Sequence, residues 1–181
     1  MNERDRPIPE SYWVEPDRFL AGEYPAHSFG VQARKRLDSF FEFGINTFID
    51  LTDPHELPPY LPMLKEQAGA YELEVRYKRF PIIDHSVPAF KTMRTILDEL
   101  DSALAAGRKV YLHCYGGIGR TGTVVGCYLV RHGKTGEEAL KQLSEWWRSV
   151  PKSRIHIHSP ETRAQADFIL QWNEHDGGSA E

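Results

Sequence analysis

Residues 110–123 decide the fold, and they read VYLHCYGGIGRTGT. Their first three residues, Val110-Tyr111-Leu112, form an apolar run that predicts a short buried β-strand. The glycines that follow permit a tight loop, and the apolar run from Val124 to Val130 predicts a buried helix behind it. A cysteine and an arginine lie in that loop. This combination indicates an anion site that contains a nucleophile.

The physical reason lies in the start of the helix. Backbone N–H groups there have no partners within the helix, and the helix dipole adds partial positive charge. Cys114 lies at the entrance to this field, which favours the thiolate, the nucleophilic form of cysteine. Arg120 offers a planar fork of donors that can hold two phosphate oxygens. Thr121 places a hydroxyl beside the arginine, where it could donate to the sulfur as the sulfur leaves.

The stretch from His113 to Thr121 resembles the His-Cys-x5-Arg-Ser/Thr signature of the cysteine-dependent protein tyrosine phosphatases, and the chain length resembles their dual-specificity branch. The resemblance implies a phosphocysteine intermediate on Cys114, phosphoryl oxygens held by Arg120, and no metal or other cofactor. It also implies a phosphate-binding loop (P-loop) whose backbone amides bind the phosphoryl group. The residues of that loop are Tyr115, Gly116, Gly117, Ile118 and Gly119.

Two other interpretations of the same stretch stay open. Residues 117–122 also read G-x-G-x-x-G, the dinucleotide-binding pattern, which a second strand and an acidic residue about twenty positions on should follow. Here the helix leads into His132-Gly133-Lys134, and another helix is predicted from Thr135. Alternatively, Cys114 is only a buried apolar cysteine, which leaves the glycines and Arg120 unexplained.

Expulsion of an alkoxide or phenolate from phosphorus requires a general acid, and Asp84 is the candidate. A predicted strand over 75–80, a helix over 90–104 and a strand over 109–113 would make the two strands parallel neighbours, with both strand ends at one sheet edge. Asp84 would then overhang Cys114. Residues 80–88 also resemble the family's mobile acid loop; the alternative for Asp84 is a turn or capping carboxylate.

Other side chains have rival or supporting roles. Asp50 and Asp53, near the end of a predicted strand over 45–51, are rival acids. Gln165 lies in a segment that resembles the one carrying a water-positioning glutamine in parts of the family; the alternative is a surface polar residue. By microscopic reversibility, Asp84 would act as base in the second step, the hydrolysis of the phosphocysteine by water. His113 is expected to support the loop by bonding its backbone.

Three further residues are candidates for other chemistry. His156 and His158 could form a metal pair, but no third ligand is evident, and a solvent-facing pair is the preferred interpretation. Cys127 is expected in the core, with a protective disulfide to Cys114 as the alternative. Two cysteines in 181 residues argue against a disulfide scaffold and favour a reducing compartment.

Length and composition favour a single globular enzyme domain. The chain has 181 residues, is 40% hydrophobic and carries a net charge of −4, so neither nucleic acid nor an anionic membrane is an expected partner. No apolar run approaches the roughly 20 residues that span a bilayer, and no signal-peptide stretch precedes the domain. We predict a cytoplasmic monomer with a flexible segment over 1–11, a phosphatase domain over 12–175 and a disordered tail over 176–181.

The remaining patterns complete the predicted fold. A strand should end at 19–22, a helix should cover 31–41, and the basic run 34–36 should be a solvated face. The proline-rich loop 54–62 lies at the ligand edge and could shape substrate entry. Thr135 and Glu138 predict a capping box, and the final helix should start at Ser159-Pro160. We predict a three-layer α/β domain whose mostly parallel sheet has helices on both faces.

The predicted function is metal-independent phosphomonoester hydrolysis, by a protein tyrosine or dual-specificity phosphatase acting on phosphoprotein or a small phosphomonoester. An inositol phosphate or phosphoinositide phosphatase is the alternative. The loop 115–119 carries no Lys or Arg, whereas family members that dephosphorylate inositol lipids or inositol phosphates often have basic residues there. The resemblance therefore favours phosphoprotein, although Lys78, Arg79 and His85 could add charge nearby. A phosphate-binding adaptor without turnover and a thiol redox protein using Cys114 and Cys127 are alternatives of other classes.

Overall fold

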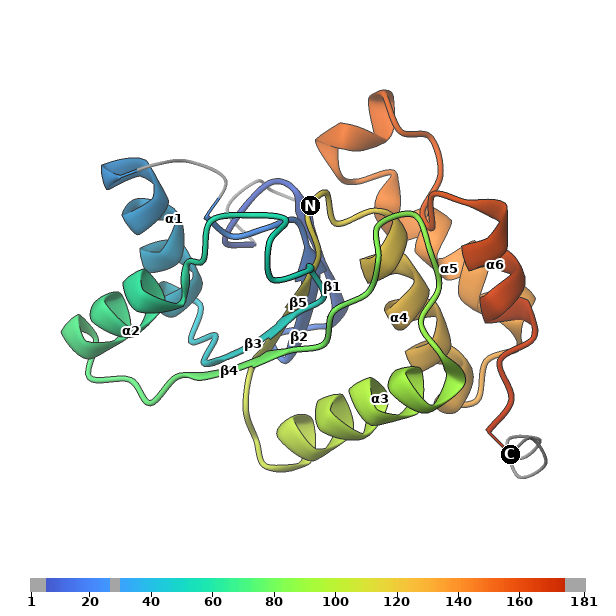
Figure 1. Cartoon of the computed structure of the whole chain (residues 1–181), viewed down its shortest axis with the longest axis horizontal. Helices are drawn as coiled ribbons and strands as arrows, with labels where there is room; N and C mark the ends of the chain where they lie inside the picture. The colour runs from blue at the N-terminus through green and yellow to red at the C-terminus, as the bar shows by residue number, and fades with distance from the viewer. Residues whose placement is uncertain (1–5, 27–29, 175–181) are drawn as a thin grey trace.

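A five-stranded sheet runs through the middle of the molecule (Figure 1). The computed structural model describes residues 6–26 and 30–174. The strands are β1 (Ser11–Glu15), β2 (Phe19–Gly22), β3 (Thr47–Asp50), β4 (Arg76–Arg79) and β5 (Val110–His113). Their order is β1-β2-β5-β3-β4; β1 is antiparallel to β2, and the other neighbours are parallel.

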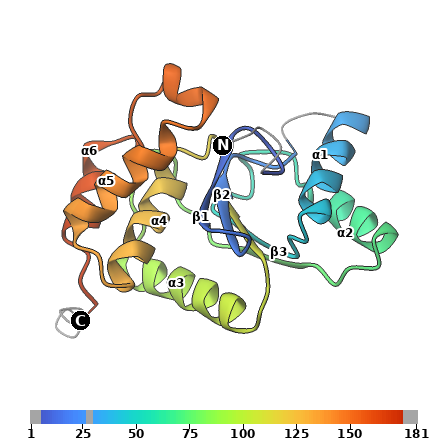
Figure 2. The same ribbon diagram turned by 180° about the vertical axis from the view of Figure 1, so that it is seen from behind.

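Helices cover both faces of this sheet, as Figures 1 and 2 show from opposite sides. One face is covered by α1 (Val31–Glu42) and α2 (Leu61–Ala70). The other carries α3 (Phe90–Ala105), α4 (Gly119–Arg131), α5 (Gly136–Trp147) and α6 (Arg163–Leu170). A short 3-10 helix, η2 (Pro151–Arg154), lies between α5 and α6. The predicted three-layer α/β fold is confirmed.

The central strand β5 explains how the site is supported. All of its residues are buried, and they alternate between the two cores: Tyr111 packs with Phe40 and Phe48 under α1 and α2, while Leu112 packs under α4. Burial of a large side chain contributes roughly 1.5–3 kcal/mol. Because β5 is buried on both faces, the loop that follows it starts from a rigid support.

The prediction that the strand before Asp84 pairs directly with β5 is wrong. The register pairs Phe48 of β3 with Tyr111 of β5, and it pairs Tyr77 of β4 with Phe48, so β3 lies between them. The cause is side-chain character: β4 reads RYKR and is half exposed, which suits a sheet edge, whereas β3 reads TFID and is fully buried. Because β4, β3 and β5 are parallel, their carboxyl ends still share one edge.

Other boundaries also differ from the predictions. The final helix begins at Arg163 rather than at Ser159-Pro160, because Thr162 and Gln165 form a capping box there. Of the segment predicted to be flexible, the structure describes 6–11, where Ile8 is 2% exposed and Ser11 begins β1, so these residues belong to the folded unit. The predicted tail over 176–181 lies outside the described residues. Over 6–26 and 30–174, no helix is long and apolar enough to cross a membrane.

Candidate active site

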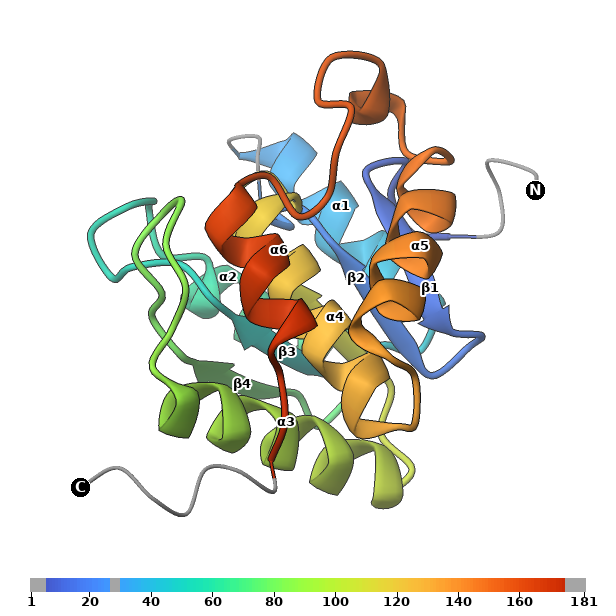
Figure 3. The ribbon, with the colours of Figure 1, turned by 90° about the vertical axis from the view of Figure 1, so that its right-hand side faces the viewer.

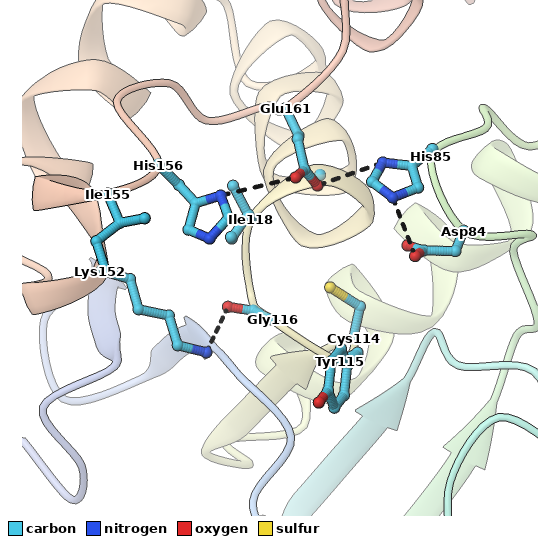
Figure 4. A pocket seen from close by; sticks show the side chains of 11 residues that line it. Asp84, His85, Cys114, Tyr115, Gly116, Ile118, Lys152, Ile155, His156 and Glu161 are labelled. Atoms are coloured by element: carbon cyan, nitrogen blue, oxygen red, sulfur yellow. Dashed lines mark hydrogen bonds and ion pairs between the residues drawn. The ribbon is translucent and has the colours of Figure 1, made fainter.

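Cys114 follows β5 directly, at the edge where the parallel strands end, and its side chain is 2% exposed. It lies at the base of a pocket of about 370 Å³ (Figure 4). The other residues that line the pocket are Asp84, His85, Tyr115, Gly116, Ile118, Gly119, Lys152, Ile155, His156 and Glu161. The structure therefore brings the predicted nucleophile, the predicted acid and most of the predicted loop to one cavity.

The loop from Cys114 to the start of α4 at Gly119 depends on glycine at one position. Gly117 has φ +74°, and a Cβ built on it would lie 2.4 Å from the carbonyl carbon of Gly22 in β2. The loop therefore packs backbone against backbone on the end of β2. This contact holds the loop over the sheet edge without any side chain at residue 117.

Gly117→Ala is expected to lower the free energy of unfolding by about 1–3 kcal/mol, because the positive φ and the clash with Gly22 act together. The loop should shift, so kcat/KM for an aryl phosphate should fall about 100-fold. Urea unfolding and steady-state kinetics would measure the two effects. Gly107→Ala is the control, since residue 107 has φ +72° but no atom near an added Cβ. Equal effects from both variants would contradict the loop contact as the cause.

Arg120, in the first turn of α4, is 2% exposed, and its guanidinium reaches Glu56 in the β3–α2 loop. Its Nη1 and Nη2 donate to the two carboxylate oxygens of Glu56, each at 2.6 Å, and Nη1 also donates to the Ile82 carbonyl at 3.1 Å. Its buried Nε has no partner among the described residues. Burial alone would lower the pKa of Arg120, but Glu56, Cys114 and Asp84 raise it, so the guanidinium stays charged.

Glu56 is a site residue that the sequence analysis missed. It belongs to the proline-rich loop assigned only to substrate entry, and its carboxylate fixes the guanidinium from a position 64 residues away. The hydrogen bonds from Arg120 hold the pKa of Glu56 below its ordinary value. The sequence does show that Glu56 is a carboxylate that follows β3, at the edge of the sheet where the ligand is expected. No local sequence pattern connects it to Arg120.

Glu56→Gln keeps the shape of the side chain and removes its charge. We expect kcat/KM for an aryl phosphate to fall about 10- to 100-fold, because the bidentate pair no longer orients Arg120. Glu66→Gln on α2, which removes an exposed pair with Arg34, should leave kcat/KM near the wild-type value. If the two variants behaved alike in steady-state kinetics, Glu56 would have no role in orienting Arg120.

Asp84 reaches the site from the loop between β4 and α3. One carboxylate oxygen lies 3.0 Å from Arg120 Nη2, and the other lies 3.4 Å from His85 Nε2. Its side chain is 52% exposed, so it faces the open part of the pocket above Cys114 (Figure 4). The structure thus brings together Cys114, Arg120 and Asp84, from three separate elements.

The rival carboxylates lie elsewhere. Asp50 is fully buried, and its oxygens accept hydrogen bonds from Thr52, from Tyr77 at 2.6 Å and from Arg79 at 2.8 Å. Burial disfavours the carboxylate, but the neighbouring His113 ring and the hydrogen bonds from Tyr77 and Thr52 outweigh burial and hold the pKa of Asp50 below its ordinary value. Neither Asp50 nor the exposed Asp53 lines the pocket.

His113 supports the loop from below, where it is fully buried. Its Nδ1 lies 3.1 Å from the Cys114 carbonyl and its Nε2 lies 2.7 Å from the Tyr60 hydroxyl. Because a carbonyl only accepts, Nδ1 carries the proton and Nε2 accepts from Tyr60. Burial lowers the pKa of His113, which keeps the imidazole neutral in this arrangement.

Thr121 and Gln165 are both fully buried beside the loop. The Thr121 hydroxyl donates to the Gly22 carbonyl at 3.5 Å, and no hydrogen bond to the Cys114 sulfur is present. Gln165 lies against Gly119, where an added Cβ would be 2.8 Å from its Nε2. Its Nε2 donates to the Ser86 carbonyl at 3.2 Å, while its Oε1 accepts from the backbone of the segment before α6. Gln165 therefore ties the acid loop to α6.

The cations that were expected to add charge are mostly engaged elsewhere. Lys78 pairs with Glu99 and Arg79 pairs with Asp50, so of the three candidates only His85 lines the pocket. A different cation, Lys152, lines it instead and is bound to Glu23 at 2.5 Å.

The two histidines considered as metal ligands face different cavities. His156 lines the main pocket and lies 3.8 Å from Glu161, whereas His158 lines a separate depression over α5 and α6. Within 6–26 and 30–174, no three His, Cys, Asp or Glu side chains are grouped to hold a metal ion. Cys127 is fully buried, and burial raises the pKa of its thiol well above the ordinary value.

Comparisons with known proteins agree with this geometry. Residues 27–134 match a family model described as "Polymorphic toxin system, DSP-PTPase phosphatase". The chain is 30% identical over 160 residues to an Arabidopsis thaliana protein named "Phosphatidylinositol 3,4,5-trisphosphate 3-phosphatase and protein-tyrosine-phosphatase PTEN1", covering 87% of this chain and 36% of that one. It is 29% identical over 124 residues to the mouse "Dual specificity protein phosphatase CDC14B", covering 66% of this chain and 24% of the relative.

The solved structure of Tk-PTP "in the active form" is also similar. It aligns with a TM-score of 0.68 and 25% identity, over 90% of this chain and 97% of that one. The chain spans only 36% and 24% of the length of the two curated relatives. The family model, by contrast, matches more than half of this chain and includes Cys114 and Arg120. The chain therefore belongs to the dual-specificity branch of the cysteine-dependent protein tyrosine phosphatases.

Proposed function

We propose that this chain hydrolyses phosphomonoesters by a metal-independent, two-step reaction and that its substrates are phosphoproteins, as in protein tyrosine and dual-specificity phosphatases. The observation that carries the proposal is that Cys114 and Asp84 line one pocket and that the buried Arg120 guanidinium lies 3.0 Å from the Asp84 carboxylate. A thiol nucleophile, a carboxyl group on the open side and a buried guanidinium are the groups that phosphoryl transfer to sulfur requires.

In the first step the Cys114 thiolate attacks phosphorus, a sulfur–phosphorus bond forms and the ester P–O bond breaks. Asp84 donates its proton to the leaving oxygen. In the second step water attacks phosphorus, the sulfur–phosphorus bond breaks, and Asp84 takes the proton from water. Inorganic phosphate and the free thiolate result, so no other reactant is consumed.

Arg120 and the backbone amides of residues 115–119 would hold the phosphoryl oxygens. The unpartnered Nε of Arg120 is one donor for this purpose. The other is Nη2, whose contact with Asp84 at 3.0 Å a phosphate oxygen would replace. Substrate binding would therefore release Asp84 from the guanidinium at the moment when it is needed as an acid.

A second substrate class has one specific observation in its favour, the name of the Arabidopsis relative. Against a phosphoinositide stands the absence of Lys and Arg from residues 115–119 and the engagement of Lys152 by Glu23. Phosphate release from phosphopeptides, inositol phosphates and phosphoinositides in EDTA separates the two classes. Release mainly from inositol compounds would overturn the phosphoprotein assignment, and binding without release would indicate an adaptor.

Asp84→Asn is expected to lower kcat about 100-fold or more for alkyl phosphates, whose leaving groups need protonation, and far less for an aryl phosphate with a good leaving group. Steady-state kinetics on both substrates would measure this difference. Asp53→Asn, a change of an exposed carboxylate outside the pocket, should affect neither substrate. An equal loss on both substrates in Asp84→Asn would remove Asp84 from the acid role.

A further inference from the structure

The segment between α5 and α6 projects beyond the body of the molecule beside the pocket (Figure 3). We call residues 151–158, which include η2, the projecting loop. Three of its residues, Lys152, Ile155 and His156, line the pocket and form one of its walls (Figure 4). A substrate that extends beyond a single phosphorylated side chain can therefore contact this wall when it is bound at Cys114.

The projecting loop exposes apolar surface that the fold does not use. Ile155 is 82% exposed and Ile157 is 72% exposed, whereas the aliphatic side chains of the two cores are buried. Single exposed hydrophobic residues are ordinary, but two within three residues at the mouth of an active site indicate a contact surface. Burial of both side chains against a partner would contribute favourable free energy to binding.

The charge around the pocket is unequal. On the projecting loop, Arg154 is exposed, and none of the described carboxylates pairs with it. Across the pocket lies the Asp84 carboxylate, 3.4 Å from His85 (Figure 4). Glu161 lies between the two sides, 3.6 Å from His85 and 3.8 Å from His156 of the projecting loop. The mouth therefore has the basic, apolar projecting loop on one side and the Asp84 carboxylate on the other.

We propose that the projecting loop binds the residues that flank the phosphorylated residue of a phosphoprotein, and that it selects flanks with acidic and apolar side chains. The proposal rests on the phosphatase function above and names the sequence context of its substrate. Arg154 would attract the acidic side chain, and Ile155 and Ile157 would pack against the apolar one. Asp84 would repel acidic residues from the other side of the pocket, which sets the orientation of the peptide.

An anionic lipid surface is the less suitable occupant of the same loop. A flat bilayer would bring its negative charge against the carboxylates of Asp84 and Glu161 as well as against Arg154. The chain also carries a net charge of −4, which opposes approach to such a surface. A peptide, by contrast, can place its acidic side chains on one wall only.

The test uses the full chain and two phosphotyrosine peptides of equal length, one with Glu and Leu beside the phosphotyrosine and one with Lys and Ser. We expect wild-type kcat/KM to be about 5- to 10-fold higher for the acidic, apolar peptide, and the preference to shrink in 1 M salt, where the Debye length is about 3 Å. Arg154→Glu should reverse the preference. Ile157→Ser should reduce it about 3-fold without reversing it.

Each peptide rate is divided by the rate on an aryl phosphate, which is too small to reach Arg154. Cys114-dependent turnover of the aryl phosphate with no peptide preference would overturn this inference and leave the proposed function intact, whereas no turnover of any substrate would contradict the function itself. Lys65→Glu, an equal charge change on α2, should keep the wild-type preference; a reversal there would make the effect one of net charge. Loss in Arg154→Glu confined to phosphoinositide in phosphatidylcholine vesicles would assign the loop to a membrane instead.

Discussion

Cys114→Ser is expected to lower kcat by about 10⁴-fold or more on every phosphomonoester, because a serine hydroxyl at this position is not ionised near neutral pH and cannot replace the thiolate as nucleophile. Phosphate binding should change little, since Arg120 and the loop amides remain in place. The measurement is phosphate release in EDTA, with the affinity for a phosphopeptide determined in parallel. A variant that binds tightly but does not turn over would be the expected result.

Cys127→Ser is the matched control. Cys127 is the other cysteine of the chain, and it is fully buried in α4 outside the pocket. Its loss should leave turnover within about 3-fold of wild type, with at most a modest fall in stability. If both cysteines proved equally necessary for activity, the thiol redox alternative would gain support and the phosphocysteine mechanism would lose it.

Arg120→Lys is expected to lower kcat/KM by about 10²- to 10⁴-fold although the positive charge is kept. A lysine has no planar fork, so it cannot bind both oxygens of Glu56 and also present donors to two phosphoryl oxygens. The effect should fall on kcat as well as on KM, because the equatorial oxygens are held most tightly in the transition state. Steady-state kinetics on an aryl phosphate would measure both constants.

Arg131→Lys provides the comparison for this substitution. Arg131 is also on α4 and is also held by both oxygens of one carboxylate, Glu174, but it lies outside the pocket. Its replacement should lower stability slightly and leave kcat/KM nearly unchanged. Similar losses of activity in the two lysine variants would show that the change at residue 120 acts through the packing of α4 and not through phosphate.

Much of the architecture was predictable where local patterns are strong. The apolar period from Phe90 to Leu104 matches α3, and the capping box of Thr135 and Glu138 is present, with hydrogen bonds of 2.8 and 3.2 Å. The strand, glycine loop and helix around Cys114 also agree with the prediction, because each of these elements carries its own sequence signal.

Elements without a strong period were missed. Helix α2 reads LPMLKEQAGA and buries only Leu64 and Ala68, so its sequence has no apolar stripe to recognise. Strand β1 is short and forms the antiparallel edge against β2, where pairing rather than composition creates the strand. The place of β3 between β4 and β5 depends on which strand tolerates exposure, and the charged residues of β4 were the unused signal.

The residues of the site also fall into those that the sequence predicted and those that it did not. Cys114 and Arg120 are joined by a local motif, and parallel strand ends correctly placed Asp84 near them. Glu56 contacts Arg120 across 64 residues, and only the folded chain reveals this pair. The contacts of Gln165 with Ser86 and with the backbone before α6 are likewise tertiary, and they show a role in holding the acid loop that the sequence did not suggest.

The most direct test of the proposed mechanism is to trap the covalent intermediate. The wild-type chain would be mixed with an aryl phosphate in EDTA, quenched in acid within the first turnovers and digested for mass spectrometry. The mechanism predicts one phosphate on the peptide that contains Cys114, with more of it in Asp84→Asn if loss of the base slows hydrolysis of the adduct. Continued phosphate release with no adduct on Cys114, together with full activity in Cys114→Ser, would contradict the mechanism.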